Sequence, residues 1–422
     1  MPALKPPPAI ELICVGAELL DGHGDDSHRG ALALRLRAAG LRLARETIVP
    51  DDPEALEGAV RAALGRCDDL LVCGGLGPTF DDITREGVAR ALGRDLVFSP
   101  RLYAGIRRKF ARLKVRPPRE NRRQAFLVRG AEPLANRAGS APGQLIVLKR
   151  PGDAPQTVAL LPGPPREMAP MFDAEVMPRL KRAHGVPGAA VLSLHLCGLP
   201  ESAADEKLRP LTRRAGPGLD FTILSGAGQV DFHAFASGPG ARGRIARCRR
   251  QALRLVGGHV FGEGPATLES TVGALLLRRR LTLAVAESCT AGLLGGRLTS
   301  APGSSAYFLG GVLAYHDSVK RGLLGVRPET LSREGAVSAG SAREMAEGVR
   351  RLVGADLALA VTGIAGPSGG GPGKPVGLVF AALAGPGRAV LVRRWLLSGD
   401  REAVRQRAAA AALRLLWKRL RS

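Results

Sequence analysis

The sequence predicts an α/β protein in which two three-layer α/β domains are joined by a small α+β module. Short apolar runs alternate with helical periods before about residue 175 and again after residue 264, a pattern typical of largely parallel sheets covered by helices. The segment between these two regions does not follow this pattern. A length of 422 residues also exceeds one typical domain two- to threefold. We therefore expect domains over residues 8–175, 178–260 and 264–422.

The first domain contains five candidate strands. They lie at residues 9–15, 41–49, 69–73, 144–148 and 157–161. Residues 28–40 and 51–65 have apolar side chains at helical spacing, and the second segment opens on an Asp cap followed by Pro. Strand, helix and strand in alternation predict a largely parallel sheet covered by helices.

The middle segment has candidate strands at 190–197, 219–224 and 229–236, with helices at 200–211 and 240–257. The run "QVDFHAFA" alternates apolar and polar residues, as a strand with one buried face does. Nothing in this segment indicates catalysis.

The third domain again alternates strands and helices. Its candidate strands are residues 281–286, 310–315, 356–361, 376–383 and 389–397. The last helix, residues 400–420, has Asp400 and Glu402 in its first turn and basic residues in its last, as the helix dipole favours. We expect it to pack on its own sheet.

Composition favours a cytoplasmic protein. No apolar run approaches the ~18 residues that span a bilayer, and "MPALKPPPAIEL" lacks a signal-peptide core. The six cysteines have no C-x-x-C spacing, which argues against a zinc cluster and against a disulfide framework. We expect no membrane contact.

The net charge of +23 raises the possibility of nucleic-acid binding. The basic residues are spread along the chain, and only 4% of residues are aromatic. Nucleic acid therefore stays an alternative partner that we do not favour. Only nine of the 61 basic residues are lysines, so a lysine beside a candidate site is informative.

The run "AVAESCTAGLLGG", residues 284–296, places Ser288, Cys289 and Thr290 directly after a strand. Ligands of open α/β sheets bind outside the carboxyl ends of the strands. Ser288 could be a nucleophile at a helix start that favours negative charge, or only a helix cap. The pattern alone leaves all three side chains open as nucleophiles.

Two further strand ends carry candidate residues. The first brings Ser304, Ser305, Tyr315 and Lys320 into one stretch. A serine needs a base, and Lys320 is a better candidate than His316, because a partly desolvated lysine can act as a neutral amine. The second, "VTGIAGPSGGGPGKPVG", could aim glycine amides and Lys374 at an anion, or could be a surface loop.

These blocks resemble the CinA carboxyl-terminal domain, a nicotinamide-nucleotide amidase of PncC type, over residues 264–422. The resemblance implies deamidation of nicotinamide mononucleotide to nicotinate mononucleotide and ammonia without a cofactor. It implies Ser288 as nucleophile, Lys320 as base, and Tyr315 and Ser305 as further active-site residues. Candidate substrate-binding residues are Thr290, Ser304, Thr362, Gly363, Gly366 and Lys374.

On this reading Ser288 attacks the carboxamide carbon, and backbone amides at the helix start hold the oxyanion. We expect Cys289 to point into the core. Two positions depart from the family. Ala291 stands where the family commonly has Gly, and His316 and Asp317 replace Ser and Asn.

The amino-terminal domain has its own candidate site in "GGLGPTFDDITREGVARALG", residues 74–93. Glycines allow a tight turn that could cradle a phosphate. Thr79 and Asp82 could cap a helix, or Asp81 and Asp82 could hold a hard cation over a diphosphate. The residues alone do not separate these two interpretations.

Residues 8–175 resemble the molybdopterin-binding domain shared by MoaB-like proteins and the front half of CinA, and the middle segment resembles the KH-like module of CinA. The chain is thus identified as a full-length member of the CinA family. The resemblance implies divalent-metal-dependent hydrolysis of ADP-ribose and a homodimer. The implied pocket residues are Glu18, Asp26, Gly74, Gly75, Gly77, Thr79, Asn121 and Gln124, with Asp81 and Asp82 at the metal.

Ala17 and His28 stand where the family usually has Asp and Asn, which removes a carboxylate and an amide from this pocket. The diphosphatase could therefore be weakened or absent. One alternative is a domain that holds a pterin or a nucleotide without chemistry. Another is an accessory protein of DNA uptake or recombination.

Overall fold

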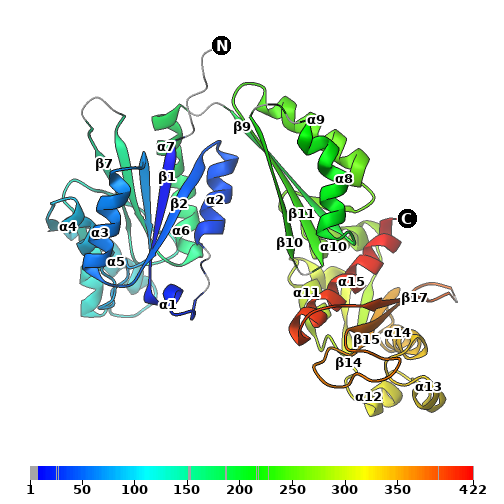
Figure 1. Ribbon diagram of the computed structural model, residues 1–422. Helices are drawn as coiled ribbons and strands as arrows, with labels where there is room; N and C mark the ends of the chain where they lie inside the picture. Colours follow the sequence, from blue (N-terminus) through cyan, green and yellow to red (C-terminus); the bar gives the residue numbers. More distant parts are fainter. Residues whose placement is uncertain are drawn as a thin grey trace. The chain divides into compact units, whose positions relative to one another are not determined.

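The computed structural model describes residues 8–24, 26, 28–150, 154–185, 188–214, 216, 218–226, 228–387 and 389–421. The chain divides into two compact units, residues 1–191 with 235–245 and residues 192–234 with 246–422. Each contains a sheet between helices (Figure 1). The start of the chain, from which we judged the absence of a signal peptide, lies partly outside the described residues.

The first unit is built on a six-stranded sheet of order β2-β1-β3-β8-β7-β6. Its strands are β1 (Ala9–Val15), β2 (Arg42–Val49), β3 (Asp69–Cys73), β6 (Glu132–Leu134), β7 (Gly143–Leu148) and β8 (Gln156–Leu161). The first four strands in this order are parallel, and β7 and β6 are antiparallel to their neighbours. A short ladder of β4 (Leu96–Phe98) and β5 (Phe126–Val128) lies apart from the sheet.

Helices cover both faces of this sheet. One face packs against α2 (His28–Ala38), α6 (Pro165–Met171) and α7 (Met177–His184), and the other against α3 (Pro53–Leu64) and α4 (Thr84–Ala91). Asp52 caps α3 through the amides of Glu54 and Ala55, as the Asp-Pro pair predicted. The short α1 (Ala17–Leu20) follows β1, and α5 (Pro100–Arg112) follows β4.

The middle segment forms a four-stranded sheet of order β10-β11-β9-β12. The strands are β9 (Ala189–Cys197), β10 (Leu219–Gly226), β11 (Gln229–Ser237) and β12 (Val260–Glu263), and the helices are α8 (Glu201–Arg213) and α9 (Ala241–Val256). Residues of β11 alternate between half-buried and buried, as the sequence predicted.

The second unit contains a five-stranded sheet of order β14-β13-β15-β16-β17. Its strands are β13 (Leu283–Glu287), β14 (Phe308–Leu313), β15 (Leu357–Gly363), β16 (Leu378–Ala384) and β17 (Leu391–Leu396). β14, β13 and β15 are parallel, whereas β16 and β17 are antiparallel.

This sheet also lies between two helical layers. One face packs against α10 (Leu268–Arg279), α11 (Leu293–Thr299) and α15 (Arg401–Arg421), so the last helix does pack on its own sheet. The other packs against α14 (Ala339–Val353), next to the short α12 (Asp317–Gly322) and α13 (Pro328–Arg333).

The predicted α/β class is confirmed, with one correction. Each large sheet is parallel only over part of its width, because β6, β7, β16 and β17 run antiparallel to their neighbours. Within the described part of the chain, no helix is both long and apolar enough to cross a membrane.

Candidate functional site

The carboxyl-terminal site lies where β13, β14 and β15 end. The chain leaves β13 for β14 on one side and returns to β15 on the other, so β13 is a topological switch point, where ligands of α/β sheets bind. Glu287 O accepts from Ala314 N at 2.8 Å, and Ser288 N donates to Val361 O at 3.0 Å. Ser288, 8% exposed, is thus held between the ends of both neighbouring strands.

Lys320 belongs to the same edge. Its side chain is buried, and Nζ donates to Tyr315 O at 3.0 Å and to Asp317 Oδ1 at 3.1 Å. Tyr315 follows Ala314, the residue bound to Glu287 just before Ser288. The fold therefore brings Ser288 and Lys320, 32 positions apart in the sequence, to adjoining strand ends.

Glu287 shapes the turn that carries Ser288. Its carboxylate is buried and accepts from the amides of Gly292, Leu294 and Gly295 at 2.8–3.0 Å. These amides form the start of α11. A carboxylate at a helix N-terminus satisfies donors that have no intrahelical partner. The amides at the helix start, which we expected to hold an oxyanion, are therefore already occupied.

Two other amides remain for that role. Among the described residues, the N–H groups of Cys289 and Thr290 donate to no oxygen, and their hydrogen bonds go to the thiol sulfur of Cys289, a weak acceptor. Both directly follow Ser288, so they are the nearest candidates for binding an oxyanion formed at its hydroxyl. Thr290 Oγ1 is buried without a hydrogen-bond partner in the described structure, whereas its carbonyl accepts from Arg405.

Cys289 points into the core, as predicted. Its side chain belongs to the cluster packed between the sheet and α15, and Sγ lies against Gly363. Burial raises the pKa of the Cys289 thiol to about 12. Since the thiolate is the nucleophilic form of cysteine, Cys289 is a poor candidate nucleophile.

Ala291 adopts the left-handed conformation, with φ +47°. Glycine reaches this region without cost, whereas alanine has a Cβ that crowds the backbone. The next residue, Gly292, also has a positive φ of 93°. The turn after Ser288 therefore explains physically why a glycine suits position 291.

Tyr315 is 58% exposed, and its hydroxyl accepts from Arg401 at 3.0 Å. Arg401 also donates to Gly366 O at 2.8 Å, so one guanidinium joins the end of β14 to the glycine-rich segment. We did not predict Arg401 from the sequence. The available signal was a basic residue in the first turn of a helix, where the dipole disfavours it.

The glycine-rich segment is tied down rather than loose. Ile364 N donates to Leu378 O, and Gly377 N donates to Ile364 O. Lys374 Nζ donates to the carbonyl of Glu334, and Thr362 Oγ1 to that of Ala336. Thr362 and Lys374 were both expected to face a nucleotide, but these two side-chain groups donate to backbone carbonyls of the protein.

Ser304 and Ser305 are not brought to Ser288. They form a 3₁₀ turn just before β14, and β14 runs parallel to β13 with Leu283 opposite Phe308. Segments that precede parallel strands lie at the opposite edge from segments that follow them. At about 3.3 Å per residue, the five residues of β13 separate the two edges by roughly 16 Å. Their expected place in this chain's own site is therefore wrong.

His316 caps α12 rather than acting as a base. Its Nδ1 accepts from Ser318 N at 3.2 Å, and the side chain is exposed. Asp317 pairs with Lys320. The two substituted positions therefore keep local roles in the helix that carries Lys320.

The amino-terminal site is a cavity of about 560 Å³ at the carboxyl edge of the first sheet. β1 lies there between β2 and β3, which is again a switch point. Of the predicted residues, the lining contains Glu18, Gly74, Gly75, Gly77, Thr79, Asp81, Asp82 and Gln124. Asn121 is buried beside the cavity and donates to Gln124 Oε1.

Thr79 and Asp82 bond to each other within the glycine turn but do not cap a helix, because α4 begins at Thr84 and its N-cap residue, Ile83, makes no side-chain cap bond. Asp82 accepts from Gly77 N at 2.6 Å, from Thr79 N at 2.7 Å and from Thr79 Oγ1 at 2.5 Å. Both carboxylate oxygens are thus occupied. A Cβ at Gly74, whose φ is +102°, would lie 2.3 Å from Val15 O, so only glycine fits there.

Sequence reasoning missed three polar or acidic residues of this lining, namely Asp51, Ser140 and Glu167, whereas His28 lines the cavity at a position that the family resemblance had placed there. Asp51 follows β2 at the same edge and accepts from Ala17 N. Asp51 precedes Asp52, the residue that caps α3, so its position in the sequence indicated a helix start and not a cavity wall. Asp26 is not part of the lining but lies with Cys14 and His28.

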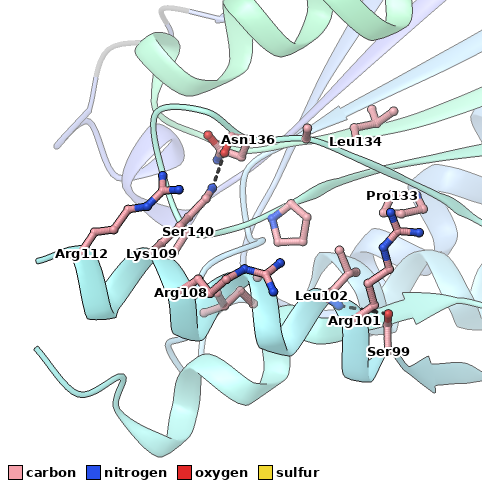
Figure 2. Close-up of a pocket in the computed structure, with 14 residues that line it drawn as sticks. Ser99, Arg101, Leu102, Arg108, Lys109, Arg112, Pro133, Leu134, Asn136 and Ser140 are labelled. Atoms are coloured by element: carbon pink, nitrogen blue, oxygen red, sulfur yellow. Dashed lines mark hydrogen bonds between the residues drawn. The ribbon is translucent and has the colours of Figure 1, made fainter.

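A second cavity, of about 470 Å³, lies between α5 and residues 133–142 (Figure 2). Its basic lining residues are Arg101, Arg108, Lys109 and Arg112, and Ser140 lines both cavities. Lys109 Nζ donates to the carbonyls of Asn136 and Gly139, and burial lowers its pKa.

Comparison with known proteins gave consistent similarities. The family model described as the CinA C-terminal domain matches residues 265–420, and that described as a probable molybdopterin binding domain matches residues 11–182.

A competence-damage inducible protein of Desulforudis audaxviator is 42% identical over 96% of this chain and 97% of its own length. A CinA-like protein of Trichormus variabilis is 41% identical over 98% of this chain and 99% of its own. A crystal structure from Klebsiella pneumoniae, titled competence damage-inducible protein A, is 39% identical over 36% of this chain and 95% of that one, with a TM-score of 0.36.

Proposed function

The chain belongs to the CinA family, and we propose that its carboxyl-terminal domain is a hydrolase that deamidates nicotinamide mononucleotide. The observation that supports this proposal is that a buried Ser288 and a buried Lys320 follow adjoining strand ends at one switch point. A serine needs a base to take its proton before it attacks a carboxamide, and Lys320 is the candidate base at this edge. The burial of Cys289 leaves Ser288 as the better nucleophile.

In this mechanism Ser288 Oγ attacks the carboxamide carbon while Lys320 takes its proton. A neutral amine has two N–H donors and one lone pair. Tyr315 O and Asp317 Oδ1 accept from Lys320, so both N–H groups of a neutral Lys320 have partners and the lone pair is left for the proton of Ser288.

The tetrahedral oxyanion is bound by the amides of Cys289 and Thr290, which exchange the Cys289 sulfur for the stronger acceptor. Its collapse breaks the carbon–nitrogen bond, and Lys320 passes the proton to the departing ammonia. Water then hydrolyses the ester on Ser288 and releases nicotinate mononucleotide.

Ammonia release from nicotinamide mononucleotide tests the proposal. We expect Ser288→Ala and Lys320→Met to lower kcat by at least ~10³-fold, and Cys289→Ala to stay within about threefold of wild type. Thermal melts check that the variants fold. The proposal fails if the wild type releases no ammonia, or if Ser288→Ala stays active while Cys289→Ala does not.

A second activity, divalent-metal-dependent hydrolysis of ADP-ribose, is supported by the amino-terminal cavity. Glu18 and Asp81 line it, and their carboxylates have no hydrogen-bond partner among the described residues. Such oxygens suit a hard divalent cation, which would offset the charge of a diphosphate. Release of AMP and ribose phosphate supports catalysis, whereas binding without release supports the non-catalytic alternative.

The homodimer that the family resemblance implies stays a prediction, which light scattering would test. DNA binding that weakens steeply with salt would support the nucleic-acid alternative.

A further inference from the structure

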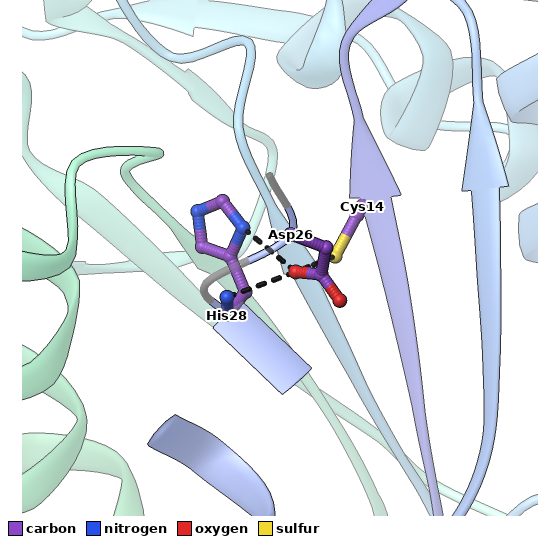
Figure 3. A group of neighbouring side chains, drawn as sticks. All are labelled: Cys14, Asp26 and His28. Carbon is purple, nitrogen blue, oxygen red and sulfur yellow. Dashed lines mark hydrogen bonds and ion pairs between the residues drawn. The ribbon is translucent and has the colours of Figure 1, made fainter. Parts of the chain in front are cut away.

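A separate group of side chains lies at the end of β1. Cys14, Asp26 and His28 each offer a ligand atom, and these atoms lie within 4.8 Å of one another (Figure 3). Asp26 Oδ1 is 3.4 Å from His28 Nδ1 and 4.0 Å from Cys14 Sγ. Ligand atoms of a tetrahedral zinc site are about 3.3–3.7 Å apart, given bonds of roughly 2.0–2.3 Å. Small shifts would therefore suffice to enclose an ion.

His28 is oriented as a metal ligand would be. Its Nε2 is hydrogen-bonded to the carbonyl of Gly163, so Nε2 carries the hydrogen and the Nδ1 of the neutral ring carries a lone pair. Nδ1 is buried and has no hydrogen-bond partner in the described structure. Metal-binding histidines commonly fix their second nitrogen on a carbonyl in this way.

The other groups also present acceptors to one another. Asp26 Oδ2 is buried and accepts from no donor group among the described residues, and the carboxyl groups of Asp26 and Glu46 lie within hydrogen-bond reach of each other. Glu46 Oε1 lies 3.7 Å from Cys14 Sγ, and Arg29 approaches Glu46 Oε2 at 3.4 Å. Two carboxylates, a thiol and an imidazole thus face one another with one peripheral arginine. A shared cation would satisfy these acceptors.

We propose that Cys14, Asp26 and His28, with Glu46 as a further oxygen ligand, bind a transition-metal ion of the zinc class. Sulfur, nitrogen and oxygen ligands together favour zinc over magnesium or calcium, which take oxygen ligands. His28 also lines the 560 Å³ cavity, so an ion can enter from there. This site is distinct from a hard cation at Glu18 and Asp81.

The absence of paired cysteines argued against a zinc cluster, and this proposal revises that expectation. The site uses a single cysteine, and its residues come from β1, from β2 and from the start of α2. Their spacing in the sequence therefore matches no metal-binding motif.

Cobalt provides the test, because a thiolate bound to Co²⁺ gives a near-ultraviolet charge-transfer band. We expect the chelator-treated full chain to bind about one Co²⁺ with this band. Zn²⁺ should displace the cobalt and raise the Tm by a few degrees, whereas Mg²⁺ should do neither.

Variants separate this site from adventitious binding. Cys14→Ala should abolish the band, and His28→Gln should weaken cobalt binding by at least ~100-fold. Cys248→Ala, which removes another buried cysteine, and Asp82→Asn should keep the band. A thermal unfolding curve of each metal-free variant shows whether that variant folds.

The proposal is overturned if the wild type shows no thiolate band with Co²⁺, or if Cys14→Ala retains it. These spectral and thermal readouts do not depend on hydrolysis of ADP-ribose. Failure of the diphosphatase would therefore leave the metal site standing, and the reverse also holds.

Discussion

The two large sheets place their candidate sites at equivalent positions and equip them differently. In each, the first strand of the sheet lies between the next strand along the chain and a later one, and the candidate residues follow its carboxyl end. The amino-terminal edge is a cavity of about 560 Å³ lined by carboxylates. The carboxyl-terminal edge holds a buried Ser288 and a buried Lys320. The sheet therefore fixes where a site lies, and the loop residues fix its chemistry.

A carboxylate organises the turn at both edges. Glu287 occupies three amides at the start of α11, and Asp82 occupies the amides of Gly77 and Thr79. Each carboxylate therefore occupies backbone amides that could otherwise have bound a ligand. An acidic residue beside a glycine turn is thus as well suited to building the turn as to binding a ligand.

The largest expected contrast is the effect of chelation. EDTA should lower ADP-ribose hydrolysis by at least ~100-fold and leave ammonia release within about twofold, since Ser288 and Lys320 need no metal. Chromatography of AMP and a coupled ammonia assay on the same sample measure both, and added Mg²⁺ should restore the first. If chelation stops ammonia release, the contrast between the two edges is wrong.

Glu287→Gln should destabilise the second unit by about 2–3 kcal/mol, because an amide cannot accept from all three N–H groups as a carboxylate does. Both tryptophans, Trp395 and Trp417, lie in this unit, so urea unfolding followed by tryptophan fluorescence reports on it alone.

Two variants serve as controls for this measurement. Asp82→Asn changes the equivalent carboxylate of the other unit, and Glu206→Gln changes an exposed carboxylate of the second unit away from the site, so both should leave the fluorescence transition unchanged. A transition for Glu287→Gln that matches wild type would show that Glu287 does not hold the turn.

Arg401→Gln should raise KM for nicotinamide mononucleotide about tenfold and change kcat by less than about threefold. Arg401 joins Tyr315 to Gly366 at the rim, whereas Ser288 and Lys320 are held by other contacts. Arg407→Gln, on the same helix but bonded to Ser398, is the matched control. A fall in kcat at constant KM would instead assign Arg401 to the transition state.

The smallest effect expected is a gain in stability. Ala291→Gly should stabilise the second unit by about 0.5–1 kcal/mol, because glycine adopts a φ of +47° without strain. Ala411→Gly, inside α15, should cost about 1 kcal/mol by the same fluorescence measurement. Equal losses in both variants would contradict the assignment of strain to position 291.

The strands of both large sheets were predictable except β6, because apolar runs of strand length stand out between helical periods, whereas Glu132–Leu134 is a three-residue strand that contains a proline. Ser288 and Lys320 were predictable as strand-end residues in an arginine-rich chain. Ser305 was predicted in the site because it is close to Tyr315 in the sequence. Ser305 precedes β14 and Tyr315 follows it, so the length of β14 separates them. Asp51 was missed because it precedes Asp52, the residue that caps α3. Arg401 was missed because its contacts with Tyr315 and Gly366 join segments far apart in the sequence.

The sequence by itself determined the α/β class, the strand ends where ligands can bind, and a short list of nucleophiles, because these follow from local hydrophobic periodicity and residue chemistry. Only the tertiary structure decided which residues meet. Strand order brings the segments that carry Ser288 and Lys320 to adjoining strand ends, buries Cys289, and gathers Cys14, Asp26 and His28 at the end of β1. Such long-range pairings depend on how strands lie side by side, and no local pattern in the chain records that order.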